Sequence, residues 1–257
     1  MIKIRSAQMK VLEGEALKRF ENEMVLYSKE FTPRLCEVLG DDQLREAIRQ
    51  AMSRADSYGF TNRGPLRLYI EIMFLCGSNF DTDPQYPEVA EILNSSDDQM
   101  QRAEKIYQGV LGYQEKVLGK NNINVREALE ALSAYARMPV MMNANNFEVE
   151  MFQELKLVFS QKVAYVGQKG VNELIHEGRV EAQKYGFSSV RGEAMMVILM
   201  FALGHGCIND PLYPWVSRTL KDERIKDSAA RAKRLEKKAV TWLNHVLARP
   251  QEEVIHE

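Results

Sequence analysis

Apolar residues recur three and four positions apart along most of the chain, which is the period of a helix with one buried face. In the first half this stripe passes through seven residues: Leu44, Ala47, Ile48, Ala51, Met52, Ala55 and Tyr58. No stretch alternates apolar and polar residues for long enough to make a strand. The pattern therefore predicts an all-α protein.

Two segments, 68–76 and 194–203, are apolar on nearly every side. A helix without a polar face is normally the buried centre of its fold, so we expect Met73, Phe74, Met200 and Phe201 to be inaccessible. The other predicted helices cover 6–30, 44–58, 89–93, 96–118, 125–137, 147–163, 171–185, 216–220 and 226–247.

Helix ends are marked by their usual residues. Thr61 and Ser188 stand where an N-cap would begin the two apolar helices. Gly59 and Gly186 stand where a left-handed residue would end the helices before them. A Ser-x-x-Gln capping box at Ser96 is predicted to open the helix 96–118.

The chain contains an internal repeat. Val38–Leu93 aligns without a gap on Tyr165–Leu220 at an offset of 127, and 16 of the 56 positions are identical. About one in twenty would match in unrelated segments. The longest shared motif is Asp-Pro-x-Tyr-Pro, which begins at Asp83 and again at Asp210. We therefore expect two tandem homologous helical units packed together, with unit 1 at 1–122, a connecting segment at 123–145 and unit 2 at 146–257.

Composition excludes several classes of function. The net charge of −2 gives no overall field for nucleic acid, and the longest apolar run, ten residues, is too short to span a bilayer. Three widely spaced cysteines do not make a disulfide framework or a zinc site. We expect no nucleic-acid partner, no membrane association and a cytoplasmic location with reduced thiols.

Candidate catalytic chemistry is sparse. No phosphate-binding loop, dinucleotide fingerprint, zinc-protease motif or nucleophile elbow occurs in the sequence. His205 and Cys207 lie close to Asp210, and Glu71 interrupts an apolar helix, where burial would raise its pKa. A structural cysteine, a single surface histidine and a Glu71–Arg67 pair explain these residues more simply. We expect no catalytic, cofactor-binding or metal-binding residues.

A partner-binding site is predicted from differences between the two copies. Trp215 replaces Glu88 in the second copy, and an exposed aromatic residue is typical of an interface anchor. Beside it lie His205 and a basic stripe that begins at Arg218 and holds nine Lys or Arg within 218–238. The simpler interpretation of the stripe is an ordinary solvated helix face, because no aromatic residues interleave with the basic ones. Trp215, His205 and Arg218 are the predicted partner-binding residues, and we expect Trp215→Ala to weaken binding with little change in melting temperature.

The repeated pattern of Tyr-Gly-Phe, an apolar Met-Phe helix, Gly and Asp-Pro-x-Tyr-Pro resembles uncharacterised bacterial helical proteins encoded beside spike and toxin genes of type VI secretion systems. In that family one copy usually ends Phe-Asp-x-Asp-Pro-x-x-Pro-Trp. Here Phe80-Asp81-Thr82-Asp83-Pro84 keeps most of this motif, whereas the Trp occurs only in the second copy. The resemblance covers about 55 residues in each half and transfers no catalytic residue.

The resemblance implies a non-enzymatic adaptor or chaperone for a secreted effector, or an immunity protein that masks a toxin. A third hypothesis is an enzyme in which Glu71, His205 and Cys207 meet in the fold. The sequence favours the adaptor. It specifies neither the partner nor the oligomeric state.

Overall fold

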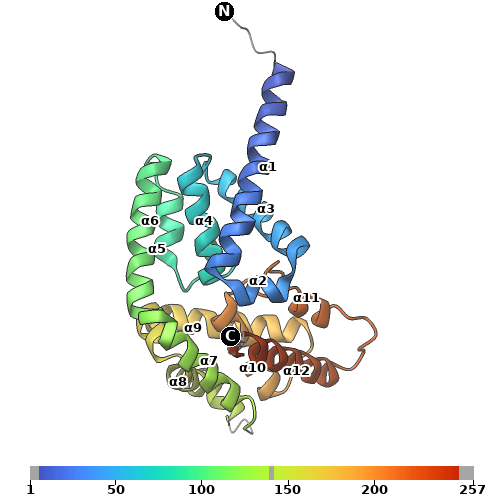
Figure 1. Cartoon of the computed structure of the whole chain (residues 1–257). Coiled ribbons are helices and arrows are strands. Elements are labelled where there is room, and N and C mark those ends of the chain that lie inside the picture. Colours follow the sequence, from blue (N-terminus) through green and yellow to red (C-terminus); the bar gives the residue numbers. More distant parts are fainter. Residues whose placement is uncertain (1–5, 139–141, 249–257) are drawn as a thin grey trace, which may run out of the picture. The chain divides into compact units, whose positions relative to one another are not determined.

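The computed structural model describes residues 6–138 and 142–248. Within these ranges the chain forms helices and no strands, as the periodicity predicts (Figure 1). The termini of predicted unit 1 and unit 2 and three residues of the predicted connecting segment, 139–141, lie outside the described ranges.

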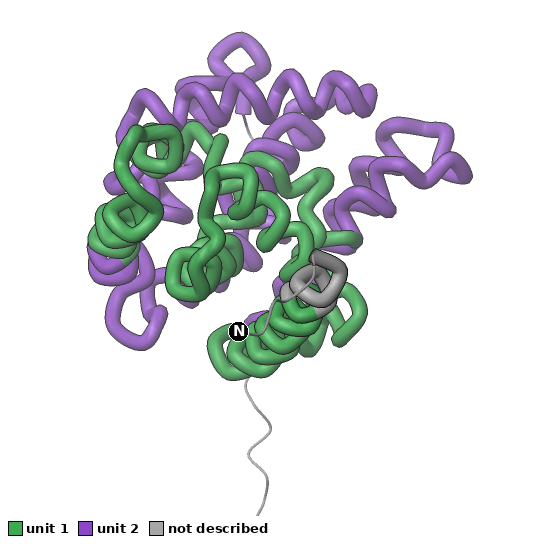
Figure 2. Tube along the Cα trace, turned by 90° about the horizontal axis from the view of Figure 1, so that it is seen from above, with its two compact units in different colours: residues 1–110, 203–214 green, residues 111–202, 215–257 purple. Residues whose placement is uncertain are grey.

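The chain forms two compact units, which Figure 2 distinguishes by colour. The first consists of Met1–Val110 and Leu203–Pro214, and the second of Leu111–Ala202 and Trp215–Glu257. These compact units group residues by contact, whereas the predicted division at 122 and 145 groups them by sequence repeat. That division stays a prediction.

In the first compact unit, α1, α3 and α4 pack against one another, and α2 packs on α1 and α3. The elements that begin here are α1 (Ser6–Phe31), α2 (Pro33–Leu39), α3 (Asp41–Ser57), α4 (Arg63–Cys76), η1 (Phe80–Thr82), α5 (Pro87–Leu93) and α6 (Gln99–Tyr113). The opening helix thus has almost the predicted bounds.

In the second compact unit, α8 packs on α9, and α7 packs on α12. The elements are η2, a π-helical turn (Gln114–Leu118), η3 (Lys120–Asn122), α7 (Ile123–Tyr135), η4 (Ala144–Asn146), α8 (Phe147–Val158), α9 (Ser160–Lys184), α10 (Val190–Leu203), α11 (Pro214–Leu220) and α12 (Ser228–Leu247). The single helix predicted over 147–163 is wrong, because the chain leaves helical geometry at Phe159 and α9 begins at the next residue.

The apolar helices α4 and α10 supply core residues, as predicted. Met73 and Phe201 are completely buried, and Phe74 and Met200 are nearly so. No helix of the described residues is both long and apolar enough to cross a membrane.

Helices begin and end at matching positions in the two halves. Both ends of α4 and α10, and both ends of α5 and α11, are separated by the repeat offset of 127 residues. The glycines with positive φ fall into the same register: Gly40 and Gly167, Gly59 and Gly186, and Gly77 and Gly204. Gly59 and Gly186 have the left-handed conformation that the sequence predicts at these helix ends.

The two Asp-Pro-x-Tyr-Pro loops form a reciprocal turn within the first compact unit. Asp83 Oδ2 accepts a hydrogen bond from the backbone N–H of His205, and Asp210 Oδ2 accepts one from the backbone N–H of Ser78, both at 2.7 Å. Each aspartate also accepts from the amide two residues further on, at 2.9 and 2.8 Å. The loops therefore have a structural role.

The N-cap predictions for the apolar helices are each displaced by one residue. Asn62, not Thr61, precedes α4. Ser189, not Ser188, precedes α10, and its Oγ accepts a hydrogen bond from the amide of Gly192 at 3.1 Å. The turns that follow Gly59 and Gly186 are each one residue longer than predicted, so each apolar helix begins one residue later.

The capping box predicted at Ser96 is wrong. Asp98 precedes α6, and its Oδ1 accepts hydrogen bonds from the amides of Met100 and Gln101. The Gln99 side chain is engaged elsewhere, because its Oε1 accepts hydrogen bonds from the amides of Thr61 and Asn62 at 2.9 Å. A contact that is distant in sequence thus replaces the local one.

Candidate functional site

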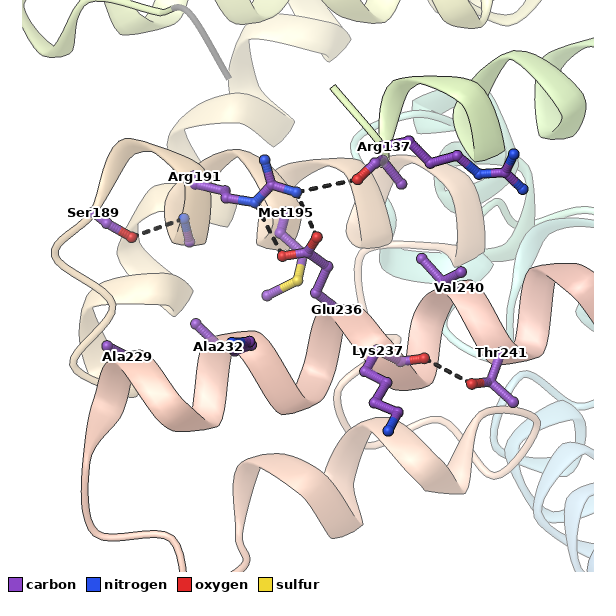
Figure 3. A pocket seen from close by; sticks show the side chains of 13 residues that line it. Arg137, Ser189, Arg191, Met195, Ala229, Ala232, Glu236, Lys237, Val240 and Thr241 are labelled. Atoms are coloured by element: carbon purple, nitrogen blue, oxygen red, sulfur yellow. Dashed lines mark hydrogen bonds and ion pairs between the residues drawn. The ribbon is translucent and has the colours of Figure 1, made fainter. Parts of the chain in front are cut away.

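A groove of about 750 Å³ lies in the second compact unit, between α10 and α12 and beside the end of α7 (Figure 3). We call it the α10–α12 groove. Its lining residues are Ala136, Arg137, Ser189, Arg191, Gly192, Met195, Ala229, Ala232, Lys233, Glu236, Lys237, Val240 and Thr241. The volume lies in the range of ligand-binding sites, which is roughly 300 to 1,000 Å³.

Helix periodicity explains which side chains line the groove. Asp227 caps α12 by accepting a hydrogen bond from the amide of Ala230 at 2.7 Å, and this fixes where the helix begins. Leu235 and Leu243 then turn into the core. The groove receives a neighbouring face of α12, on which Ala229, Ala232, Glu236 and Val240 are spaced by three and four.

Arg191 on α10 forms hydrogen bonds with α12 and with the segment that follows α7. Its Nε donates to Glu236 Oε2 on α12 at 3.0 Å, and its Nη2 donates to Glu236 Oε1. The same guanidinium donates to the carbonyl oxygens of Ala136 and Met138, at 3.1 and 3.0 Å, where α7 has ended. The hydrogen bond with Glu236 is the main cause of the raised pKa of Arg191. Arg191 is thus a structural clamp whose charge is already compensated.

The other three cations that line the groove are more exposed than Arg191. Arg137, Lys233 and Lys237 are exposed. Figure 3 shows Arg191 and Glu236 facing each other, whereas the side chains of Arg137 and Lys237 extend away from this pair. Counting Arg191, four cations and one carboxylate line the groove, so its rim is basic.

The floor of the groove is apolar, and a smaller recess of about 70 Å³ in the same compact unit shares lining residues with the groove. Met195 and Val240 line both cavities. The recess is enclosed mainly by aliphatic side chains: Leu132, Ala194, Ile198, Leu199, Ala239 and Leu243. An apolar floor with a few polar groups at its edge is typical of a binding site.

The predicted anchor Trp215 lies on α11 in the second compact unit. It is only half-buried, and its ring centroid is 6.4 Å from that of Trp242. Its Nε1 is buried and has no hydrogen-bond partner among the described residues. The ring therefore packs within its own unit. Its role in binding a partner stays a prediction.

The predicted residue His205 lies in the first compact unit, in the reciprocal turn. It is half-buried, and its Nε2 is 3.2 Å from Thr82 Oγ1. Cys207, two residues on, is completely buried. Glu71 Oε1 accepts a hydrogen bond from Arg67 Nε at 2.9 Å, which is the pair that the simpler interpretation predicts. Among the described residues no three His, Cys, Asp or Glu side chains are grouped to hold a metal ion.

Arg218 and the basic stripe are largely exposed. Arg224 is paired with Asp222 at 2.8 Å, and Arg231 donates to the carbonyl oxygen of Ile225 at 2.5 Å. Lys233 and Lys237, which belong to the same stripe, line the α10–α12 groove. The stripe is therefore partly the rim of a cavity, which the sequence interpretation missed.

Two signals in the sequence point to this groove. Arg191 lies in the first turn of α10, a helix that is apolar from Ala194 onward, and the first copy has Gly64 at this position. Glu236 is one of only four acids within the basic segment 218–238. Their pairing depends on how α10 and α12 pack, and sequence spacing does not give that arrangement.

Comparisons with known proteins add no assignment. No protein-family model matches the chain. The comparisons with curated proteins and with solved structures find no significant match either.

Proposed function

We propose that this chain is a non-enzymatic interaction protein that holds a segment of a partner protein in the α10–α12 groove. The observation that carries the proposal is the groove itself, with its apolar floor and exposed basic rim. A helix bound in an apolar groove is a recurring mode of peptide recognition. Surfaces of this kind in stable proteins commonly mark binding sites.

More specifically, the partner is a secreted effector of a bacterial type VI secretion system, and the chain is its cytoplasmic adaptor or chaperone. The support is the resemblance carried by Tyr58-Gly59-Phe60, Tyr185-Gly186-Phe187 and the two Asp-Pro-x-Tyr-Pro loops. In this proposal the two halves are tandem homologous helical units. The helix ends and the positive-φ glycines that recur at an offset of 127 support this view.

The absence of catalysis is part of the proposal. The residues that a catalytic site would use are engaged in structural contacts. Glu71 pairs with Arg67, His205 contacts Thr82, and Asp83 and Asp210 accept backbone hydrogen bonds in the reciprocal turn. These contacts favour an interaction protein over the enzyme hypothesis.

The test is affinity capture from native cytoplasm with three forms of the full chain: the unmodified protein, Ala232→Trp, which fills the groove, and the control Ala230→Trp on an exposed position of α12. We expect the control to recover the same partner as the unmodified chain. Ala232→Trp should recover at least about tenfold less, which corresponds to about 1.4 kcal/mol. Equal recovery by both variants, with unchanged melting temperatures, would contradict the proposal.

A further inference from the structure

The α10–α12 groove has the length of a short helix. Its wall on α12 runs from Ala229 to Thr241, and a helix rises about 1.5 Å per residue, so the wall is about 18 Å long. An occupant that follows this wall would make about three helical turns. A surface of this length binds a helix through side chains on one of its faces.

The positive charge of the rim favours an acidic occupant. The carboxylate of Glu236 is engaged by Arg191, so it does not compensate Arg137, Lys233 or Lys237. Within the described residues, none of these three cations has a salt bridge to a carboxylate. On α12 the basic character continues through the exposed residues Arg234 and Lys238. An occupant with carboxylates along its edges would complement this rim.

The apolar floor of the groove requires that the occupant also carry apolar side chains. Met195, Val240, Ala232 and Ala136 present an apolar surface, and the recess that Met195 and Val240 also line has mainly aliphatic walls. An occupant that carries only charge would leave this surface uncovered. Aliphatic side chains at helical spacing would cover it and bring a flanking acidic edge to the lysines.

The first compact unit offers a contrast. A smaller groove of about 250 Å³ lies between α4 and α6, lined by Gly64, Pro65, Arg67, Leu68, Glu71, Met100, Ala103, Glu104 and Tyr107. Its one cation, Arg67, pairs with Glu71, and Glu104 adds a negative charge. The basic rim is thus a property of the second half. Gly64 matches Arg191 in the repeat, so the clamp is also found only there.

From the length, charge and floor together, we propose that the α10–α12 groove binds an acidic amphipathic helix of the partner protein. Its aliphatic face covers Met195 and Val240, and its carboxylates meet Lys233, Lys237 and Arg137. This inference rests on the proposed function and adds the chemistry of the recognised segment.

The test uses a labelled synthetic peptide of about twelve residues. It carries leucines at helical spacing, flanked by glutamates, and its binding to the full chain is measured by fluorescence anisotropy. We expect binding that weakens as salt is raised from about 50 to about 300 mM, because the rim charges are exposed. Two control peptides keep either the leucines, with lysine for glutamate, or the composition, in scrambled order. Both should bind at least about tenfold more weakly.

Protein variants locate the site. Lys233→Glu combined with Lys237→Glu should weaken peptide binding at least about tenfold. The control, Lys156→Glu with Lys169→Glu, makes the same change in net charge at exposed positions of the same compact unit outside the groove, and it should change binding less than about twofold. Ala232→Trp should also abolish binding, through shape alone.

Three results would overturn the inference: no binding of the acidic peptide, equal binding of the scrambled peptide, or equal effects of the two double substitutions. The proposed function is judged separately by partner capture. If Ala232→Trp prevents partner capture while the acidic peptide fails to bind, the groove still holds a partner and only its inferred chemistry is wrong.

Discussion

Asp83 Oδ2 accepts a hydrogen bond from the backbone N–H of His205 at 2.7 Å, and the repeat-related pair, Asp210 and Ser78, makes the same hydrogen bond at the same distance. Each Asp-Pro loop thus satisfies a backbone donor of the other. The motif that is most visible in the sequence therefore stabilises a turn, and its recurrence in both halves follows from this reciprocal arrangement.

Gly77→Ala is expected to destabilise the protein strongly. Gly77 has a φ of 92°, and a Cβ atom there would lie 2.5 Å from the carbonyl oxygen of Leu203. A strained backbone costs about 1 to 3 kcal/mol, and the clash adds to it. The control is Gly40→Ala, where φ is 74° and the added Cβ meets open space. Urea unfolding should show the larger loss for Gly77→Ala. Equal losses would mean that close approach at Gly77 contributes nothing.

Asp210 gives stability a defined pH dependence. Burial raises the pKa of its carboxyl from 3.8 to about 6. A folded-state pKa above the unfolded value means that the stabilisation is present below the unfolded pKa and is lost as pH rises through about 6. Between about pH 4 and pH 7 the free energy of unfolding of the unmodified protein should fall by up to about 3 kcal/mol relative to that of Asp210→Asn.

The measurement is the free energy of unfolding in urea at several pH values, for the native protein and Asp210→Asn. Asp222→Asn is the control. Hydrogen bonds from Arg224 lower the pKa of Asp222 to about 2, so the stabilisation by this carboxylate is lost only in strong acid. The free energy of unfolding of Asp222→Asn should therefore run parallel to that of the unmodified protein above about pH 5. A parallel curve for Asp210→Asn as well would show that the Asp210 carboxyl is ionised throughout.

Arg54→Ala should cost roughly 3 kcal/mol, because it leaves a buried charge unpaired. Arg54 Nε donates to Asp81 Oδ2 at 2.6 Å, and Tyr69 OH donates to the same oxygen at 2.9 Å. The Asp81 side chain is completely buried. Arg49→Ala, which removes only exposed or partly exposed pairs, should cost less than about 1 kcal/mol in the same denaturation assay. Similar losses for both variants would count against the Asp81 pair.

Trp215→Ala is expected to lower the melting temperature, which revises the expectation drawn from the sequence. The ring contacts Trp242 within the second compact unit, and an aromatic pair is worth about 0.5 to 1.5 kcal/mol beyond the area it buries. Calorimetry should therefore show a shift of several degrees. An unchanged melting temperature together with loss of partner capture would restore Trp215 as an exposed anchor.

The sequence predicts the helices better than the contacts between them. Periodicity and the glycines at positions 59 and 186 locate the helices, because the causes are local. The capping box at Ser96 fails because Gln99 is used by Thr61 and Asn62, which are distant in sequence. The groove was not predicted for the same reason. Arg191 and Glu236 are 45 residues apart, and only the packing of α10 and α12 brings them together.

The most direct test of the central claim is photo-crosslinking from inside the groove. A photoreactive amino acid at position 232, on the groove wall, is compared with the same amino acid at position 230, which is exposed outside it. On irradiation in native cytoplasm, position 232 should crosslink to a single acidic helical segment of one partner protein, identified by mass spectrometry, and position 230 should not. Equal crosslinking from both positions, or crosslinks from position 232 to segments of no common chemistry, would contradict the account.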